Sequence, residues 1–255
     1  MLFDSHAHYD DSKFDKDRYE IINKAHESGI GYILNAASNI ASAVESIALT
    51  QEFEFVYASV GIHPHNVGDI NDNTLVTLAD FTKNAKVAAI GEIGLDYYYD
   101  NSPREIQKYW FARQVAMARS LKLPIIVHNR DAHEDTLKIL KVENAKSVGG
   151  VFHCFSGSVE MAKELLKNNF YISIGGSVTF KNAVKTVEVV KYVPLDRLLI
   201  ETDCPYLTPE PYRGKRNDSS FIGHVVQKIA DIKGLSFEEV EDITTKNTKE
   251  LFRIS

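Results

Sequence analysis

Short apolar runs alternate with amphipathic helical patterns along the whole chain. The residues Ile40, Ala43, Val44, Ile47 and Ala48 recur at i, i+3, i+4, i+7 and i+8, which predicts a helix with one buried face. Apolar runs typical of buried strands lie at 2–7, 32–36, 55–60, 87–92, 124–128, 150–153, 170–174 and 197–203. Helical patterns lie at 10–28, 40–48, 74–81, from 102, from 131, 159–166, 182–190, 221–230 and 236–251. Every strand run is therefore followed by a helical pattern.

This alternation predicts an α/β fold, a single (β/α)8 TIM-type barrel with an extra C-terminal helix at 236–251. A doubly wound open sheet is the alternative, because periodicity alone cannot show that a sheet closes. The chain has 255 residues and contains no linker, repeat or low-complexity tract, so we expect one domain over residues 1–255.

Three helix starts carry a capping-box pattern. Ser102-Pro103-Arg104-Glu105 adds a proline at the first helical position, and Asp131-Ala132-His133-Glu134 and Ser236-Phe237-Glu238-Glu239 repeat the spacing. We expect each of these segments to begin a helix with its first residue as the cap.

Composition narrows the class of protein. The net charge of -6 argues against binding of nucleic acid over a large basic surface, although it allows a small basic patch beside a pocket. Two cysteines cannot form a disulfide framework, and no apolar run approaches the roughly 20 residues of a membrane span. Met1 leads directly into strand-like sequence without a signal-peptide pattern. We therefore expect a cytoplasmic protein with no membrane partner; its oligomeric state stays open, a monomer included.

The unusual polar residues fall at the carboxyl ends of the predicted strands, which open onto one face of a barrel. They are His6 and His8 after the first strand, His63 and His65 after the third, Glu92, His128 and His153 at the ends of the fourth, fifth and sixth, and Asp203 at the end of the eighth. Packing alone does not produce such a convergence, so the pattern predicts a metal site.

Even four of these six imidazoles with the two carboxylates exceed the four ligands of one tetrahedral zinc ion. Either some of them only support the ligands, or two divalent ions are bound, with Glu92 near the middle of the strand order as the bridge. Mixed nitrogen and oxygen ligands suit Zn or Mn and permit Mg. Asp203 could be a ligand, a general base or both in turn. Glu201 could orient a ligand or form an ion pair inside the barrel.

Nucleophilic catalysis by a side chain is not favoured. Cys154 and Cys204 each directly follow a proposed ligand, so strand alternation turns them outward as small buried hydrophobes. No G-x-S-x-G elbow is present, since the segment Phe155-Ser156-Gly157-Ser158 lacks the first glycine.

Several motifs spread over the whole chain carry a resemblance to a known family. They are Phe3-Asp4-Ser5-His6-Ala7-His8, Gly61-Ile62-His63-Pro64-His65, Gly91-Glu92-Ile93-Gly94-Leu95-Asp96-Tyr97-Tyr98, Pro124-Ile125-Ile126-Val127-His128-Asn129-Arg130, His153-Cys154-Phe155-Ser156-Gly157, Leu199-Ile200-Glu201-Thr202-Asp203-Cys204-Pro205-Tyr206 and Arg213-Gly214-Lys215-Arg216-Asn217. With these motifs the chain resembles the TatD family of metal-dependent deoxyribonucleases, within the amidohydrolase-like superfamily. It departs at Tyr9, where an aliphatic residue is more usual, which bears on pocket shape and on no ligand.

The resemblance implies a role for each motif residue. Two divalent metal ions are expected, with His6 and His8 on one ion, His128 and His153 on the other, Glu92 between them, and Asp203 as ligand and general base. His63 faces the substrate phosphate, with His65 as a second candidate, and Asp4 joins Glu201 among the residues that could orient the ligands. A glutamate stands where amidohydrolases acting on cyclic amides carry a carbamylated lysine, which favours phosphodiester cleavage.

Substrate contacts are expected from the loops that follow the strands. Arg130, Arg213, Lys215 and Arg216 could hold phosphates, and Tyr97, Tyr98 and Tyr99 could stack unpaired bases, although loop packing and a solvated turn explain them as well. The expected function is hydrolysis of DNA phosphodiester bonds by a metal-activated water, as a 3′ to 5′ exonuclease preferring single strands. A metal-dependent ester or amide hydrolase, such as a D-aminoacyl-tRNA deacylase, is the alternative. A non-enzymatic metal-binding scaffold predicts lost ligands, and all six are present.

Overall fold

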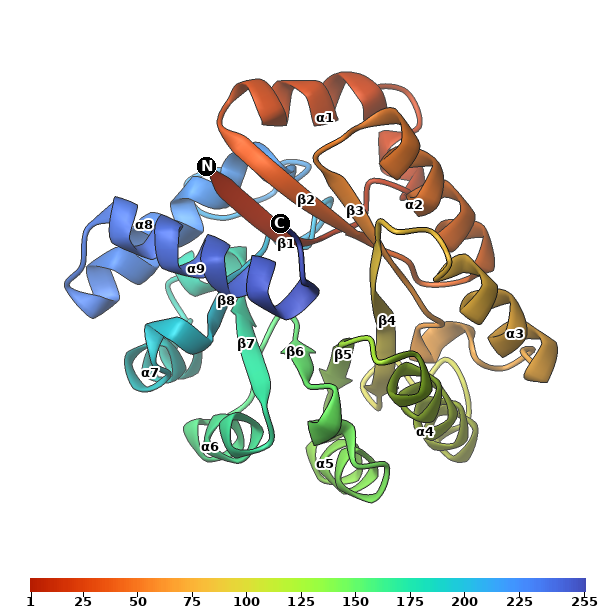
Figure 1. Cartoon of the computed structure of the whole chain (residues 1–255). Helices are drawn as coiled ribbons and strands as arrows, with labels where there is room; N and C mark the ends of the chain where they lie inside the picture. The colour runs from red at the N-terminus through yellow and green to blue at the C-terminus, as the bar shows by residue number, and fades with distance from the viewer.

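Eight parallel strands form one sheet in which each strand pairs with its neighbours in chain order. The computed structural model describes residues 1–255 (Figure 1). The strands are β1 (Leu2–Ala7), β2 (Ile30–Ala36), β3 (Val56–Val60), β4 (Val87–Asp96), β5 (Ile125–Arg130), β6 (Gly150–Phe152), β7 (Phe170–Ile174) and β8 (Leu198–Ile200). Simple chain order with parallel pairing is the topology of a (β/α)8 barrel.

The barrel closes between β1 and the segment that follows β8. Ala7 and Cys204 form an isolated parallel bridge. Beside it the Asp203 amide donates to the His6 carbonyl at 2.9 Å, and the His8 amide donates to the Cys204 carbonyl at 2.8 Å. The closure confirms the predicted barrel and excludes the doubly wound alternative.

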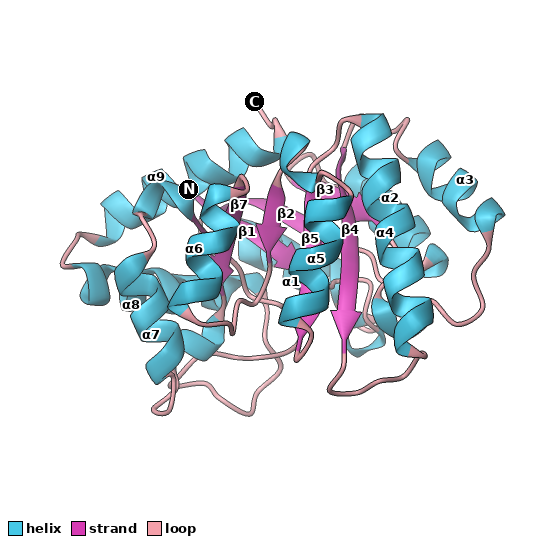
Figure 2. Cartoon of the chain, turned by 90° about the horizontal axis from the view of Figure 1, so that it is seen from below, coloured by secondary structure: helices cyan, strands magenta, loops and turns pink.

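Nine α-helices surround the sheet, with one following each strand and a ninth at the carboxyl end (Figures 1 and 2). They are α1 (Arg18–Glu27), α2 (Ile40–Glu52), α3 (Asp72–Phe81), α4 (Arg104–Leu121), α5 (His133–Val142), α6 (Val159–Lys167), α7 (Val184–Tyr192), α8 (Ile222–Lys233) and α9 (Phe237–Phe252). None of them combines the length and apolar character that crossing a bilayer requires.

Helix α9 covers the amino-terminal end of the barrel, where the two chain termini also lie (Figure 1). Leu251 and Phe252 join the apolar cluster that fills the barrel interior, together with Phe3 of β1. The Asn247 side chain donates to the Leu198 carbonyl at 2.9 Å and so ties α9 to β8. With this end closed, the opposite end carries the long loops and the cleft described below.

The carboxyl ends of four predicted strands differ from the structure. β4 runs on to Asp96 and β5 to Arg130, because the two strands keep pairing as far as Asp96 opposite Arg130. β6 ends at Phe152 and β8 ends at Ile200, one and three residues before the predicted ends. Beyond these strands Cys154 and Asp203 have φ values of 43° and 55°, and left-handed backbone cannot continue a strand.

Two of the three predicted caps are wrong. The Ser102 hydroxyl donates to the His65 carbonyl at 3.2 Å, and α4 begins with Pro103 as its cap and no side-chain cap bond. Ala132 occupies the cap of α5, because Asp131 adopts left-handed backbone with φ 54°. The capping box at Ser236 is confirmed, with both of its reciprocal bonds to Glu239 present. The first predicted helix is also shorter, since a 3-10 turn at Ser12–Phe14 precedes α1.

Gly94, which lies between Glu92 and Asp96 in β4, allows β4 and β5 to approach each other closely. Gly94 has φ 152°, and a Cβ atom built there would lie 1.9 Å from the His128 carbonyl oxygen. Only glycine fits a backbone this close to its neighbour.

We expect Gly94→Ala to lower the free energy of unfolding by about 3 kcal/mol or more, since it combines left-handed strain with a collision against backbone. Urea unfolding followed by circular dichroism measures this. The control is Gly234→Ala, where φ is 67° and no atom lies within 4 Å of the added carbon, and where we expect a loss of about 1 kcal/mol. Equal losses in the two variants would show that β4 shifts freely.

Candidate metal centre

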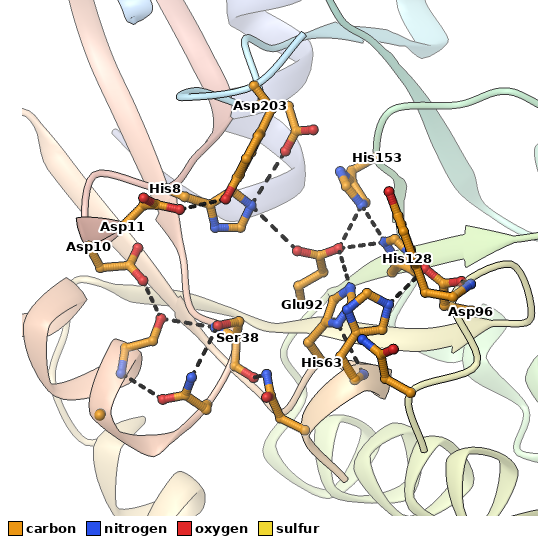
Figure 3. A pocket seen from close by; sticks show the side chains of 18 of the residues that line it. His8, Asp10, Asp11, Ser38, His63, Glu92, Asp96, His128, His153 and Asp203 are labelled. Carbon is orange, nitrogen blue, oxygen red and sulfur yellow. Dashed lines mark hydrogen bonds and ion pairs between the residues drawn. The ribbon is translucent and has the colours of Figure 1, made fainter. Parts of the chain in front are cut away.

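A cleft of about 1060 Å³ opens at the carboxyl ends of the strands. Seven of the eight convergent residues line it, namely His8, His63, His65, Glu92, His128, His153 and Asp203. The eighth, His6, is 1% exposed and packs against His8, with the two ring centres 4.8 Å apart. Figure 3 shows Glu92 in the middle of the cleft, with His8 and Asp203 on one side and His63, His128 and His153 on the other.

The first group of donors surrounds one oxygen of Glu92. Oε2 lies 3.4 Å from His6 Nε2 and 3.6 Å from His8 Nε2. The two imidazole nitrogens are 3.1 Å apart, and Asp203 Oδ1 lies 3.8 Å from His6 and 3.4 Å from His8. Four donors that share a tetrahedral ion at about 2.1 Å are about 3.4 Å apart, so this group fits one divalent ion.

The second group surrounds the other oxygen of the same carboxylate. Glu92 Oε1 lies 2.7 Å from His153 Nε2, 2.8 Å from His128 Nδ1 and 3.4 Å from His63 Nε2. His128 Nδ1 and His153 Nε2 are 3.2 Å apart. Donors on adjacent corners of an octahedral ion are about 3.0 Å apart, so the atoms of Glu92, His128 and His153 fit a second ion.

The electrostatics hold Glu92 and His6 in the forms that bind a cation. Against burial, the neighbouring carboxylates raise the pKa of His8, His128 and His153, so these three rings must lose a proton before they bind a cation. Burial, together with neighbouring His153, lowers the pKa of His6 to about 4, so its ring is neutral at pH 7. Burial opposes ionisation of Glu92, but the histidines around it hold its pKa well below the usual range. His8 is also buried, yet its hydrogen bond to Asp203 raises the pKa of His8 to about 10. The cleft thus holds ionised carboxylates beside imidazoles, and cation binding there would release protons.

Comparison with known proteins places the chain in a family. The family model described as TatD related DNase matches residues 3–253. This chain belongs to the TatD-related DNase family. The uncharacterized metal-dependent hydrolase YabD of Bacillus subtilis (strain 168) is 49% identical over 255 residues, 100% of both chains. The 3′-5′ ssDNA/RNA exonuclease TatD of Erwinia tasmaniensis is 32% identical over 259 residues, 99% of this chain and 100% of that protein.

A solved structure supports the same placement. The crystal structure of the TatD homologue YJJV from Escherichia coli K12 is 30% identical to this chain and superposes with a TM-score of 0.93. The match covers 100% of this chain and 98% of that one. The TatD family membership inferred from the motifs and the barrel fold predicted from the alternation of strands and helices are therefore both confirmed.

Within this TatD-family cleft, Asp96 is a functional candidate that the sequence reasoning missed. Its Oδ2 accepts from His65 Nε2 at 2.9 Å and lies 3.1 Å from His128 Nε2. Its Oδ1 accepts from the amides of Tyr98 and Tyr99 at 3.0 and 2.8 Å. Burial opposes its charge, but these hydrogen bonds hold the pKa of Asp96 below its usual range. The sequence held one sign of this role: Asp96 follows Glu92 by four residues, so the two side chains lie on the same face of β4 if that strand continues to Asp96.

Asp4 and Glu201 take different positions. Asp4 lies away from the imidazole rings and accepts from the Thr202 amide at 2.9 Å, the Thr202 hydroxyl at 2.6 Å and the Ser219 hydroxyl at 2.7 Å. Glu201 lies beneath the centre, where its Oε1 accepts from the Cys154 amide at 2.5 Å and is 3.9 Å from His153 Nδ1. Burial raises the pKa of Asp4 to about 6 and that of Glu201 to about 7.

Of the predicted substrate contacts beyond the histidines, only Arg130 and Tyr99 line the cleft. The Arg130 guanidinium lies 4.2 Å from the Tyr98 ring centre and 5.0 Å from that of Tyr99. Three other predicted contacts are engaged elsewhere. The Tyr97 hydroxyl donates to Asp135, Arg216 pairs with Asp17, and Arg213 lies over Phe180.

The two cysteines lie on the scaffold of the cleft and not in its lining. Cys204 is fully buried and Cys154 is partly buried. Burial raises the pKa of both thiols well above its ordinary value, so neither is a ready thiolate nucleophile.

We expect Asp96→Asn to lower the free energy of unfolding by about 2–4 kcal/mol, because the asparagine amide would place a donor against the donating Nε2 atoms of His65 and His128. Thermal and urea unfolding measure the loss. The control is Asp72→Asn, whose exposed carboxylate pairs with Arg113 and is worth about 1 kcal/mol or less. A loss for Asp96→Asn within that range would mean that the carboxylate does not hold the two histidines.

Proposed function

We propose that this protein is a divalent-metal-dependent hydrolase of phosphodiester bonds, acting as a 3′ to 5′ exonuclease on single-stranded DNA. The observation that carries the proposal is the position of Glu92, whose two oxygens face two separate groups of histidines. A carboxylate between two cations is the arrangement of two-metal phosphoesterases.

Four residues would hold the first ion, namely His6, His8, Asp203 and one oxygen of Glu92. Glu92, His128 and His153 would hold the second. The donor set of imidazoles and carboxylates accepts Zn or Mn and permits Mg. When bound, the two ions lower the pKa of a water and neutralise charge on the phosphoryl oxygens.

Asp203 would act as the general base. Its side chain is 15% exposed and lines the cleft, and its hydrogen bond with His8 helps, against burial, to hold the pKa of Asp203 below the ordinary value. The carboxylate is therefore ionised at neutral pH. Because Oδ1 faces the two histidines, Oδ2 is free to accept a proton from the attacking water and later to pass it to the leaving oxygen.

His63 would donate a hydrogen bond to the substrate phosphate. The His65 amide donates to His63 Nδ1 at 3.2 Å, so the proton of the neutral ring is on Nε2. Burial lowers the pKa of His63 to about 4, which keeps the ring in this form at pH 7. Nε2 lies 3.4 Å from Glu92 Oε1, so this N–H donor points to the place where a bridged phosphate would lie.

Arg130 with Tyr98 and Tyr99 would hold the end of the strand. The two tyrosines are 59% and 55% exposed and stand edge to face beneath the guanidinium. Such aromatic surfaces stack unpaired bases without regard to sequence, and a duplex does not offer its bases in this way. The family description as DNases and the name of the Erwinia relative, a 3′-5′ ssDNA/RNA exonuclease, support this substrate class.

We expect His6→Ala to retain one tightly bound ion and Glu92→Ala to retain none, because only Glu92 contributes to both groups. Protein stripped with EDTA, reloaded with Zn or Mn and dialysed is measured by plasma mass spectrometry. His224→Ala, outside the cleft, serves as the control and should keep both ions. Equal metal content in the His6 and Glu92 variants would contradict the bridging role.

We expect the protein with Mg or Mn to shorten 5′-labelled single-stranded DNA stepwise from its 3′ end and to leave circular single strands intact. Asp203→Asn should lower kcat by roughly 100-fold or more, because it removes the proton acceptor. The same Asp203→Asn protein, purified in parallel, controls for contaminating nucleases, and Asp72→Asn, which should stay active, controls for an unspecific effect of substitution. Cleavage of the circle, equal activity of the Asp203 variant, or faster hydrolysis of D-aminoacyl-tRNA than of DNA would overturn the proposal.

A further inference from the structure

Three buried side-chain atoms of the protein have no hydrogen-bond partner, and all three lie beneath the metal centre. They are His6 Nδ1, His153 Nδ1 and Glu201 Oε2. Buried polar atoms are paired in folded proteins, with protein groups or with ordered water. Three unpaired atoms at one place therefore indicate a shared partner.

The geometry around these atoms suits a small bridging ligand. The His6 and His153 rings stack with centroids 4.1 Å apart at 12°, and one polar atom from each histidine and from Glu201 lies within 4.8 Å of the others. Three atoms that hydrogen-bond to one oxygen lie no more than about 5 Å from one another, so a group this compact can share a single water. The Glu201 Oε1 to His153 Nδ1 distance of 3.9 Å is too long for a direct bond.

We infer that one ordered water lies inside the barrel between His6 Nδ1, His153 Nδ1 and the Glu201 carboxylate. The Nε2 atoms of both rings face Glu92, so each ring carries its proton on Nδ1 when Nε2 binds an ion. The water accepts from both Nδ1–H groups and donates to Glu201 Oε2. Glu201 is fully buried, and its Oε1 is already fixed by the Cys154 amide.

This site makes Glu201 a positioning residue for both ion positions of the proposed centre. His6 belongs to the first group and His153 to the second, so one carboxylate would orient a ligand of each through the same water. The inference rests on the metal-binding part of the proposed function and not on the substrate.

The first test is a crystal structure of the wild-type protein at high resolution, with and without Mn. We expect density for one water within 3.2 Å of both Nδ1 atoms and of Glu201 Oε2. Direct contacts between Nδ1 and the carboxylate, with no such density, would overturn the inference. Neither result depends on which bond the enzyme hydrolyses.

The second test is calorimetric titration of metal-free protein with Mn, comparing Glu201→Gln with Asp96→Asn. The glutamine amide would present a donor to a water whose two acceptor positions are already used, so both ion affinities should fall at least tenfold. Asp96 contacts only His128 among the ligands, so its variant should weaken one affinity. Unchanged affinities for Glu201→Gln, or a loss confined to one ion, would overturn the inference. Thermal unfolding of the metal-free variants separates these effects from a general loss of structure.

Discussion

The candidate metal centre depends on how the barrel closes, where β1 pairs with the segment that follows β8. Two backbone hydrogen bonds join His6 and His8 to Asp203 and Cys204, which lie almost 200 residues away in the chain. Asp4 stabilises the same closure through Thr202 and Ser219. The ladder that closes the fold therefore also sets the 3.4 Å separation between His8 and Asp203, and stability and chemistry share one set of bonds.

Glu92 is central because of where β4 stands in the closed sheet. It projects into the cleft from the strand midway around the barrel, and its two oxygens reach histidines from β1 on one side and from the β3, β5 and β6 ends on the other (Figure 3). Burying a carboxylate is costly unless it is paired, and the surrounding imidazoles offset that cost. The same contacts hold nitrogen and oxygen donors close together around one carboxylate, which is the arrangement that a cation requires.

Much of this architecture could be predicted from the sequence, because strand and helix periodicities are local and the ends of parallel strands open on one face. The contacts of Asp96 with His65 and His128 could not be predicted, because they require β4 to continue past Glu92. Only the pairing of β4 with β5 decides where β4 ends. Tyr97 and Arg216 were expected to face substrate because of their loops. Their partners Asp135 and Asp17 are distant in sequence, and no local pattern shows such pairings.

Negative and positive side chains lie on different sides of the cleft. This separation would let a protein with net negative charge bind a polyanion on one side of the cleft and repel it from the other. Asp10, Asp11 and Glu45 line the side near α1 and α2, and the arginine on that side, Arg18, already pairs with Glu45. Arg130 is the lining arginine with no carboxylate partner, and it stands on the opposite side. In the proposed nuclease a phosphate chain is therefore attracted toward Arg130 and repelled from the acidic side. A strand that cannot extend in both directions through the cleft presents a terminus to Glu92, and this asymmetry favours cleavage from an end over cleavage within a chain.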